Sequence, residues 1–306
     1  MEPTQSVHSQ TLPEQILHRL DWQVIRRLDG LLQGNYRTLF YGQGLDFADL
    51  REYEPGDDIR HIDWNVTARM DYPYVRQYHA DREITAWFLL DLSPSMLFGT
   101  MDRQKRSILL DFVGAMARLL TRNGNRVGAI LYGSKAELTI PPRTGKGHVL
   151  HLMHELLKRQ TLPGDSMTNL APLLEAGLHT IRRRAQVFVL SDFISEPGWE
   201  RPLNLLNRRH DVLTIRLWDP REIELPDVGL IVMEDAETGE QLYVDTSDRA
   251  FRRRFAEASQ AREAMIRELF SKAGVDALAL STEEDLVGAL VRFITLRQRR
   301  SQALHG

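Results

Sequence analysis

Five oxygen-bearing side chains in this sequence have the types and spacing that a hard divalent cation needs. They are two carboxylates and three hydroxyls: Asp91, Ser93, Ser95, Thr168 and Asp192. Magnesium ions take oxygen ligands in an octahedral shell and usually keep several water molecules. Because hydroxyls add no negative charge, an ion held mainly by them stays electrophilic and accepts an anionic ligand. The set therefore predicts a site for Mg²⁺, Mn²⁺ or Ca²⁺ that a carboxylate from a partner protein completes.

The segments around these residues alternate between apolar strands and helices. We predict strands at 84–90, 126–132, 137–140, 186–190, 212–217 and 275–280, and helices at 105–121, 147–160, 169–183, 199–209, 248–272 and 283–297. Such alternation predicts an α/β fold, a doubly wound, mostly parallel sheet with helices on both faces. Ligands of such sheets bind at the carboxyl ends of the strands. Asp91 and Asp192 each follow a strand and Thr168 opens a helix, so we expect all five side chains at this edge.

Residues 1–80 are expected to form an N-terminal segment that precedes the α/β domain of residues 81–306. Apolar residues at helical spacing predict an amphipathic helix over 13–34. Such a helix normally packs on its own domain, and docking on a partner or a membrane surface is the alternative. The segment after this helix is irregular. Two short apolar runs around a turn predict a hairpin inserted near 221–247.

One part of the N-terminal segment is dense in charged residues. Its members are Asp57, Asp58, Arg60, Asp63 and Arg69. Because opposite charges around a turn satisfy one another, we favour a structural role as an ion-paired turn, and docking of a partner is the alternative. Trp64 lies in the same block and is expected to pack in the core or against the domain rather than to present a binding surface.

Three histidines recur every three residues in one predicted helix, at positions His148, His151 and His154. The apolar stripe of that helix lies on its other side, and no His-Glu-x-x-His pattern accompanies them. We therefore expect the histidines to face solvent rather than to bind a metal.

The five oxygen-bearing residues and the N-terminal segment each resemble a known family. Asp91-x-Ser93-x-Ser95 with Thr168 and Asp192 resembles the metal-ion-dependent adhesion site (MIDAS) of von Willebrand factor A domains. The N-terminal segment resembles a bacterial family, domain of unknown function 58, through these residues: Gly44-Leu45-Asp46-Phe47, Leu50-Arg51-Glu52-Tyr53, Pro55-Gly56-Asp57-Asp58-Ile59-Arg60, Ile62-Asp63-Trp64, Ala68-Arg69 and Val75-Arg76. The resemblance implies a von Willebrand factor A-like fold that binds proteins through a metal ion. It also implies a MoxR-type AAA+ ATPase as partner, in the maturation or remodelling of a client protein. The sequence departs from many A domains at Asp165-Ser166-Met167, where glycines are usual.

We expect a binding module rather than an enzyme. An aspartyl-phosphate hydrolase needs a second carboxylate two residues after Asp91, and Ser93 stands there. A serine nucleophile needs a neighbouring base, and no histidine is near Ser93 or Ser95 in the sequence. A metal-dependent hydrolase that uses the same Asp, Ser and Thr side chains is the alternative.

Composition argues against several other classes of protein. The chain has 39 Lys and Arg against 42 Asp and Glu, a net charge of −3, which disfavours a nucleic-acid-binding role. It has no cysteine, so disulfide scaffolds, thiolate metal sites and cysteine nucleophiles are excluded. No apolar run approaches the roughly 18 residues of a membrane span, and no basic and apolar leader opens the sequence. We expect a cytoplasmic protein with no membrane span.

Overall fold

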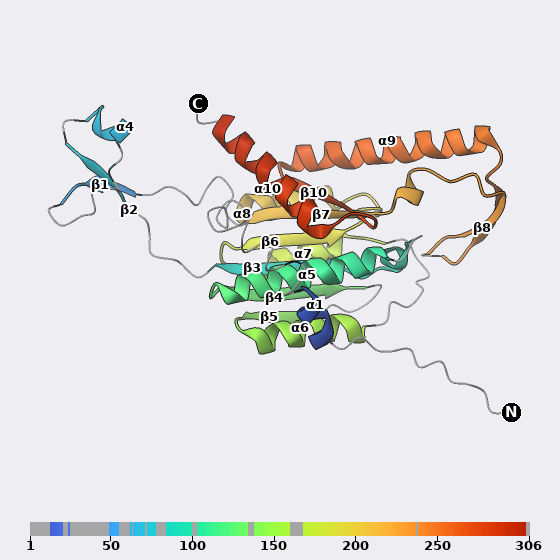
Figure 1. Ribbon diagram of the computed structural model, residues 1–306, viewed down its shortest axis with the longest axis horizontal. Coiled ribbons are helices and arrows are strands. Elements are labelled where there is room, and N and C mark those ends of the chain that lie inside the picture. Colours follow the sequence, from blue (N-terminus) through green and yellow to red (C-terminus); the bar gives the residue numbers. More distant parts are fainter. Residues whose placement is uncertain are drawn as a thin grey trace.

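The computed structural model describes residues 13–20, 24, 49–54, 62, 64–70, 72–77, 84–99, 103–133, 138–159, 168–236 and 238–303. A six-stranded sheet with the strand order β10-β7-β6-β3-β4-β5 forms its centre (Figure 1). The strands are β3 (Thr85–Asp91), β4 (Arg126–Tyr132), β5 (Leu138–Arg143), β6 (Gln186–Ser191), β7 (Asp211–Trp218) and β10 (Asp276–Ser281). Only β5 runs antiparallel to its neighbour in this sheet. The predicted α/β fold with a mostly parallel, doubly wound sheet is confirmed.

Helices cover both faces of the sheet because its central strands are apolar on both sides. One face packs on α5 (Lys105–Arg122), α6 (Lys146–Lys158) and α10 (Leu286–Ala303), and α1 (Pro13–Leu20) packs on α5 and α6 in the same core. The other face packs on α7 (Ala171–Thr180), α8 (Glu200–Arg209) and α9 (Arg249–Ala273). Every residue of β6 is buried, as a strand covered on both faces requires.

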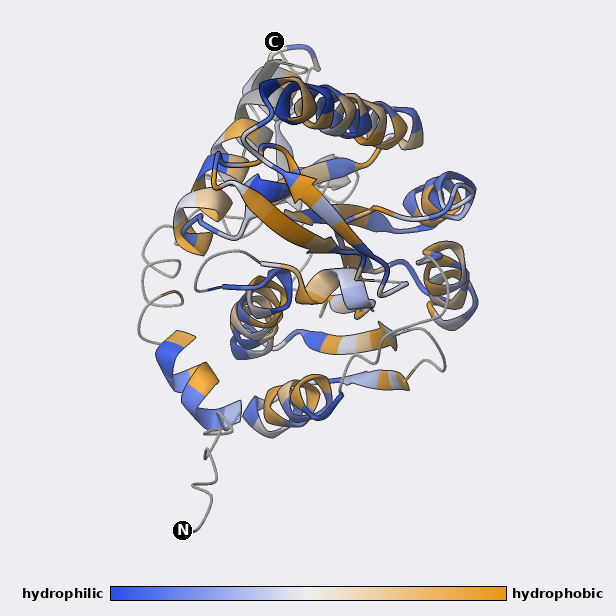
Figure 2. Ribbon diagram, turned by 90° about the vertical axis from the view of Figure 1, so that its right-hand side faces the viewer, coloured by the Kyte–Doolittle hydropathy of each residue, from blue (hydrophilic) through white to orange (hydrophobic). Residues whose placement is uncertain are grey.

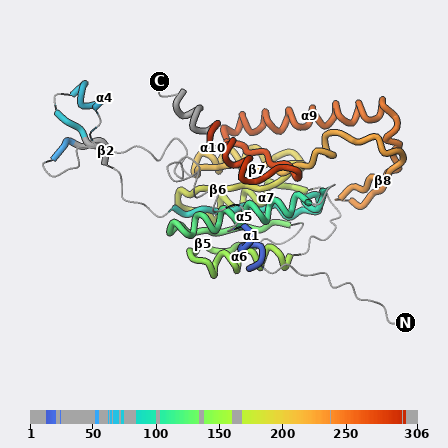
Figure 3. The backbone as a smooth tube through the Cα atoms, in the orientation of Figure 1, coloured from blue at the N-terminus to red at the C-terminus, as the bar shows by residue number. Residues whose placement is uncertain are grey.

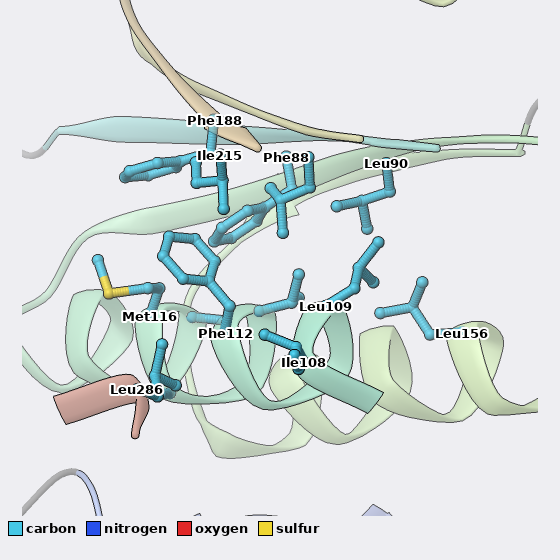
Figure 4. Close-up of a cluster of buried hydrophobic side chains, with 14 of the residues drawn as sticks. Phe88, Leu90, Ile108, Leu109, Phe112, Met116, Leu156, Phe188, Ile215 and Leu286 are labelled. Atoms are coloured by element: carbon cyan, nitrogen blue, oxygen red, sulfur yellow. The ribbon is translucent and has the colours of Figure 1, made fainter. Parts of the chain in front are cut away.

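Aromatic side chains fill the first of these two cores. The rings of Phe88 on β3 and Phe188 on β6 stack with their centroids 5.1 Å apart, and Phe112 of α5 meets Phe188 edge to face (Figure 4). All three side chains are fully buried. This packing holds α5 against β3 and β6, the two strands whose ends carry Asp91 and Asp192.

The described part of the N-terminal helix packs on its own domain, as expected. Ile16, Leu17 and Leu20 of α1 are buried in the core that contains α5 and α6. Arg19 of α1 forms an ion pair with Asp111 of α5, at 2.5 Å between Nη2 and Oδ1. Residues 21–34 of the predicted helix, apart from residue 24, lie outside the described residues.

Replacement of Leu17 by alanine tests this docking. We expect Leu17→Ala to lower the free energy of unfolding by about 2 kcal/mol, because it empties part of a packed core. Urea denaturation measures the change. His18→Ala alters an exposed residue of the same helix and should leave stability within about 0.5 kcal/mol of wild type. Equal stability of the two variants would show that α1 does not dock.

The N-terminal segment contains a small sheet that the sequence did not indicate. Strands β1 (Asp49–Glu52) and β2 (Tyr74–Gln77) pair antiparallel, and the single helical turn α4 (Trp64–Thr67) lies between them in sequence. Strands of four residues are too short to show a clear alternation of apolar and polar side chains. Figure 1 shows this unit apart from the six-stranded sheet.

Within this unit, the expectation that Trp64 packs against the domain is wrong. Trp64 is 68% exposed, since it lies on the single helical turn α4, which packs against β2. Arg69 is also exposed. Asp57, Asp58, Arg60 and Asp63 lie outside the described residues, so the ion-paired turn stays a prediction.

The predicted hairpin is present, formed by β8 (Leu230–Glu234) and β9 (Gln241–Asp245). It lies beyond the carboxyl edge of the sheet, between β7 and the start of α9 (Figures 1 and 3). Several of its apolar side chains, including Leu230, Val232 and Tyr243, are exposed, and Figure 2 shows the apolar character of its strands.

The histidines of α6 divide into two groups. His151 and His154 are exposed, as expected. His148 is half-buried, and its Nε2 lies 2.7 Å from the carbonyl oxygen of Val127, so the expectation of a solvent-facing side chain is wrong there. Position 148 lies in the first turn of α6, close enough to β4 for this hydrogen bond.

None of the helices in the described ranges is both long and apolar enough to cross a lipid bilayer.

Candidate metal centre

The chain folds back on itself directly after β3 and gathers three of the five predicted side chains. Asp91 is the last residue of β3 and is fully buried. The backbone amide of Ser93 donates to Asp91 Oδ1 at 2.9 Å, and the hydroxyl oxygens of Ser93 and Ser95 are 3.1 Å apart. Ser93 also precedes the short helix η3 (Pro94–Leu97), but its side chain makes no capping hydrogen bond. The Ser93 hydroxyl instead hydrogen-bonds to the Asp91 carboxylate and lies next to the Ser95 hydroxyl.

The end of β6 brings the fourth side chain to the same place, because β3 and β6 are parallel neighbours in register. The Ser191 hydroxyl donates to Asp91 Oδ2 at 2.6 Å, and Asp192 follows it, fully buried. Phe193 then adopts a positive φ of 53°, which is rare for a residue with a large side chain. Its ring packs edge to face on that of Phe270, with the ring centroids 4.7 Å apart, and this contact stabilises the turn that contains Asp192.

Thr168 lies in a loop that is attached to the same edge. Its carbonyl oxygen accepts a hydrogen bond from the amide of Glu196 at 2.9 Å, and the Ser195 hydroxyl accepts one from the amide of Leu170 at 3.0 Å. The Thr168 side chain is largely buried. The structure thus brings Asp91, Ser93, Ser95 and Asp192 together and fastens the loop of Thr168 beside them. Residues 165–167 lie outside the described residues.

The two carboxylates of this set have opposite electrostatic environments. Burial, followed by the nearby Asp192 carboxylate, raises the pKa of Asp91 from 3.8 to about 6, although hydrogen bonds from Ser191 and Ser93 oppose the rise. Burial by itself would also raise the pKa of Asp192, but the Lys105 ammonium, by its charge and its hydrogen bond, acts together with Arg216 and the amide of Ile194 to hold that pKa below its ordinary value. Asp91 is therefore the carboxylate whose negative charge is least compensated.

Three residues of this edge were missed in the sequence. Ser191 donates to Asp91, and Lys105 forms ion pairs with both Asp192 and Glu222, each at 2.6 Å. Lys105 did carry a signal, since it is in helical phase with Ile108, Leu109 and Phe112 on the buried face of α5. Glu222 carried none, because it lies in the short helix η4 (Pro220–Glu222), far from Lys105 in the sequence.

The donor set fits a hard divalent cation. All its candidate ligands are oxygens, the ligand type that Mg²⁺ and Ca²⁺ prefer. Among the described residues Asp91 forms hydrogen bonds with neutral donors and no salt bridge, so it keeps a buried charge that a cation would neutralise. In the described ranges, no three His, Cys, Asp or Glu side chains lie close enough together to hold a metal ion. An ion at this edge would therefore need the serine and threonine hydroxyls as ligands. We call Asp91, Ser93, Ser95, Thr168 and Asp192 the candidate metal centre.

The family model described as "protein of unknown function DUF58" matches residues 49–265, well over half of the chain. The chain belongs to the DUF58 family. An uncharacterized protein of Mycobacterium tuberculosis is 37% identical over 289 residues, which cover 94% of this chain and 91% of that protein. The family resemblance expected from the N-terminal segment is confirmed.

Solved structures similar to this DUF58 chain include two with low sequence identity. The conserved hypothetical protein BatB from Bacteroides thetaiotaomicron is 14% identical with a TM-score of 0.46, and the match covers 71% of this chain and 99% of that one. The SpRpn10 VWA domain is 12% identical with a TM-score of 0.37, and the match covers 69% of this chain and 94% of that one. The strand order of the DUF58 chain, with Asp91 at the end of a central strand, agrees with the von Willebrand factor A-like fold expected from its sequence.

Proposed function

We propose that this DUF58 protein is a divalent-metal-dependent protein-interaction module. The observation that carries the proposal is the convergence of Asp91, Ser93, Ser95 and Asp192 at the carboxyl edge, with Asp91 buried and hydrogen-bonded only to neutral donors among the described residues. A von Willebrand factor A-like fold suggests an interaction module in its own right. Asp91 and the hydroxyls of Ser93, Ser95 and Thr168 would hold the ion, which is Mg²⁺ or a similar divalent cation. When bound, the ion supplies an electrophilic position that accepts a carboxylate from the partner.

The proposed partner is a MoxR-type AAA+ ATPase, with which the module acts in the cytoplasm on a client protein. This part of the proposal rests on the family resemblance of the N-terminal segment. The hairpin β8–β9 supports an interaction role, because its exposed apolar side chains lie at the same end of the sheet as the candidate metal centre. We propose binding rather than catalysis, and no role for nucleic acid.

Binding to the MoxR-type ATPase of the same genome tests this function. We expect Thr168→Ala to weaken binding about tenfold in constant Mg²⁺, because it removes one of the candidate ligands. Biolayer interferometry at fixed nucleotide concentration measures the affinity. Substitution variants are preferable to EDTA alone, since EDTA also withdraws Mg²⁺ from the nucleotide of the ATPase.

His151→Ala is the matched control, because it alters an exposed residue of α6 and should leave the affinity unchanged. Equal binding by wild type and Thr168→Ala would contradict a metal-dependent interface. Turnover of phosphoester or peptide substrates with Mg²⁺ or Mn²⁺ that disappears in Asp91→Ala would replace the binding module with the metal-dependent hydrolase.

A further inference from the structure

One buried lysine links the candidate metal centre to the turn that leads into the hairpin. Lys105 is the first residue of α5, and its side chain is fully buried. Its Nζ is 2.6 Å from Asp192 Oδ2 and 2.6 Å from Glu222 Oε1. The second oxygen of Glu222 accepts a hydrogen bond from the backbone amide of Asp219 at 3.0 Å. A single ammonium group thus joins two carboxylates from different loops.

This contact makes the two carboxylates of the centre unequal. Asp192 uses one oxygen for the Lys105 ammonium and the other for the amide of Ile194, at 3.0 Å. Both oxygens of Asp91 accept hydrogen bonds from neutral donors only, the Ser93 amide and the Ser191 hydroxyl. A divalent cation therefore gains more by binding Asp91 than by displacing a buried ammonium from Asp192.

We propose that Lys105 sets the affinity of the centre for a divalent cation by neutralising Asp192 and keeping its carboxylate out of the inner shell of the ion. The inference rests on the proposed function, since it concerns the same centre. A buried positive charge repels a nearby cation strongly because the protein interior screens charges poorly. The centre consequently binds the ion weakly by itself, and a carboxylate from the partner is needed for full occupancy. Lys105 is thus a positioning residue that makes the metal dependent on the partner.

Two substitutions at this contact should change Mg²⁺ affinity in opposite directions. Lys105→Met removes the repelling charge and frees Asp192, so we expect Mg²⁺ to bind at least about tenfold more tightly. Glu222→Gln leaves the Lys105 charge with Asp192 as its single carboxylate partner, so we expect weaker binding of Mg²⁺. If the contact only held the loops in place, both substitutions would loosen the centre and both would weaken binding.

The controls separate charge from folding. Lys146→Met removes the same charge from an exposed position at the start of α6. Because β5 runs antiparallel to β4, this position lies at the amino edge of the sheet, opposite the candidate metal centre, and the substitution should not change the affinity for Mg²⁺. Lys105→Met removes the ammonium that pairs with the Glu222 carboxylate, and a buried carboxylate without its partner lowers the stability of the fold. The double variant Lys105→Met/Glu222→Gln avoids that imbalance, and we expect it to bind Mg²⁺ more tightly than Glu222→Gln alone.

Isothermal titration calorimetry with Mg²⁺ alone, at neutral pH, decides between the outcomes. Tighter binding in each variant that lacks the Lys105 charge supports the inference. The inference is overturned if wild type binds Mg²⁺ and replacing Lys105 gives equal or weaker binding, both in wild type and in Glu222→Gln. That result leaves the proposed function standing. No binding of Mg²⁺ to wild type or to either variant that lacks the Lys105 charge overturns the proposed function and this inference with it.

Discussion

Asp91→Asn is expected to stabilise the metal-free protein at neutral pH while it removes the binding of Mg²⁺. Asp91 is fully buried, and its pKa is raised from 3.8 to about 6. A carboxyl whose pKa is higher in the folded than in the unfolded state destabilises the fold above that folded pKa, where it is charged. The difference between 3.8 and 6 corresponds to at most about 3 kcal/mol. An amide keeps the shape of the side chain without the buried charge.

Urea denaturation in EDTA at two pH values tests this prediction. The advantage of Asp91→Asn should be present above pH 6 and should shrink as the pH falls toward 4, because native wild type then protonates Asp91. Asp192→Asn is the matched comparison. Its carboxylate has a lowered pKa and pairs with Lys105, so its loss should destabilise the fold at neutral pH. Equal destabilisation by both substitutions would contradict the view that Asp91 is held for a cation.

The double substitution Ser93→Ala/Ser95→Ala should weaken Mg²⁺ binding by about a hundredfold, or about 2.7 kcal/mol. Both hydroxyls belong to the proposed ligand set, and they lie 3.1 Å apart beside Asp91. Neither change alters the buried carboxylates. The fold should therefore remain intact while the affinity for the ion falls.

Calorimetric titration with Mg²⁺ measures this loss, and circular dichroism confirms that the variant is folded. Ser247→Ala/Ser271→Ala removes two exposed hydroxyls elsewhere and should titrate like wild type. An unchanged isotherm for Ser93→Ala/Ser95→Ala would remove the hydroxyls from the ligand set.

The sheet and its carboxyl edge were predictable because the central strands are continuous apolar runs. Trp87 to Leu90 and Val187 to Leu190 are buried on both faces, and the polar residue after each run marks the point where the strand ends. Parallel strands place such ends at one edge. Asp91 and Asp192 could therefore be placed together without any structure.

The side chains that contact Asp91 and Asp192 were not predictable, because these contacts join distant parts of the chain. Lys105 and Glu222 are 117 positions apart, and Ser191 and Asp91 are 100 apart. Lys105 was the one of these residues with a detectable signal in the sequence. It is one of only five lysines in a chain with 34 arginines, and it occupies a buried helix position. A charged residue in an apolar stripe indicates a buried partner but does not identify it.

The N-terminal segment shows a different limit of sequence reasoning. Trp64 was expected to be buried because large aromatic side chains usually are, yet it is exposed on a single helical turn. The pairing of β1 with β2 joins residues more than twenty positions apart with only four residues in each strand. Strands this short carry too little periodicity for their pairing to be deduced.

Diffraction from crystals grown with Mn²⁺, at a wavelength where manganese scatters anomalously, tests the central claim most directly. We predict one anomalous peak per chain, bounded by Asp91, Ser93 and Ser95, with Lys105 still paired to Asp192. Crystals of Ser93→Ala/Ser95→Ala should lack the peak. A wild-type map with no peak at this edge, or with manganese bound only elsewhere, would contradict the claim that these oxygens form a metal centre.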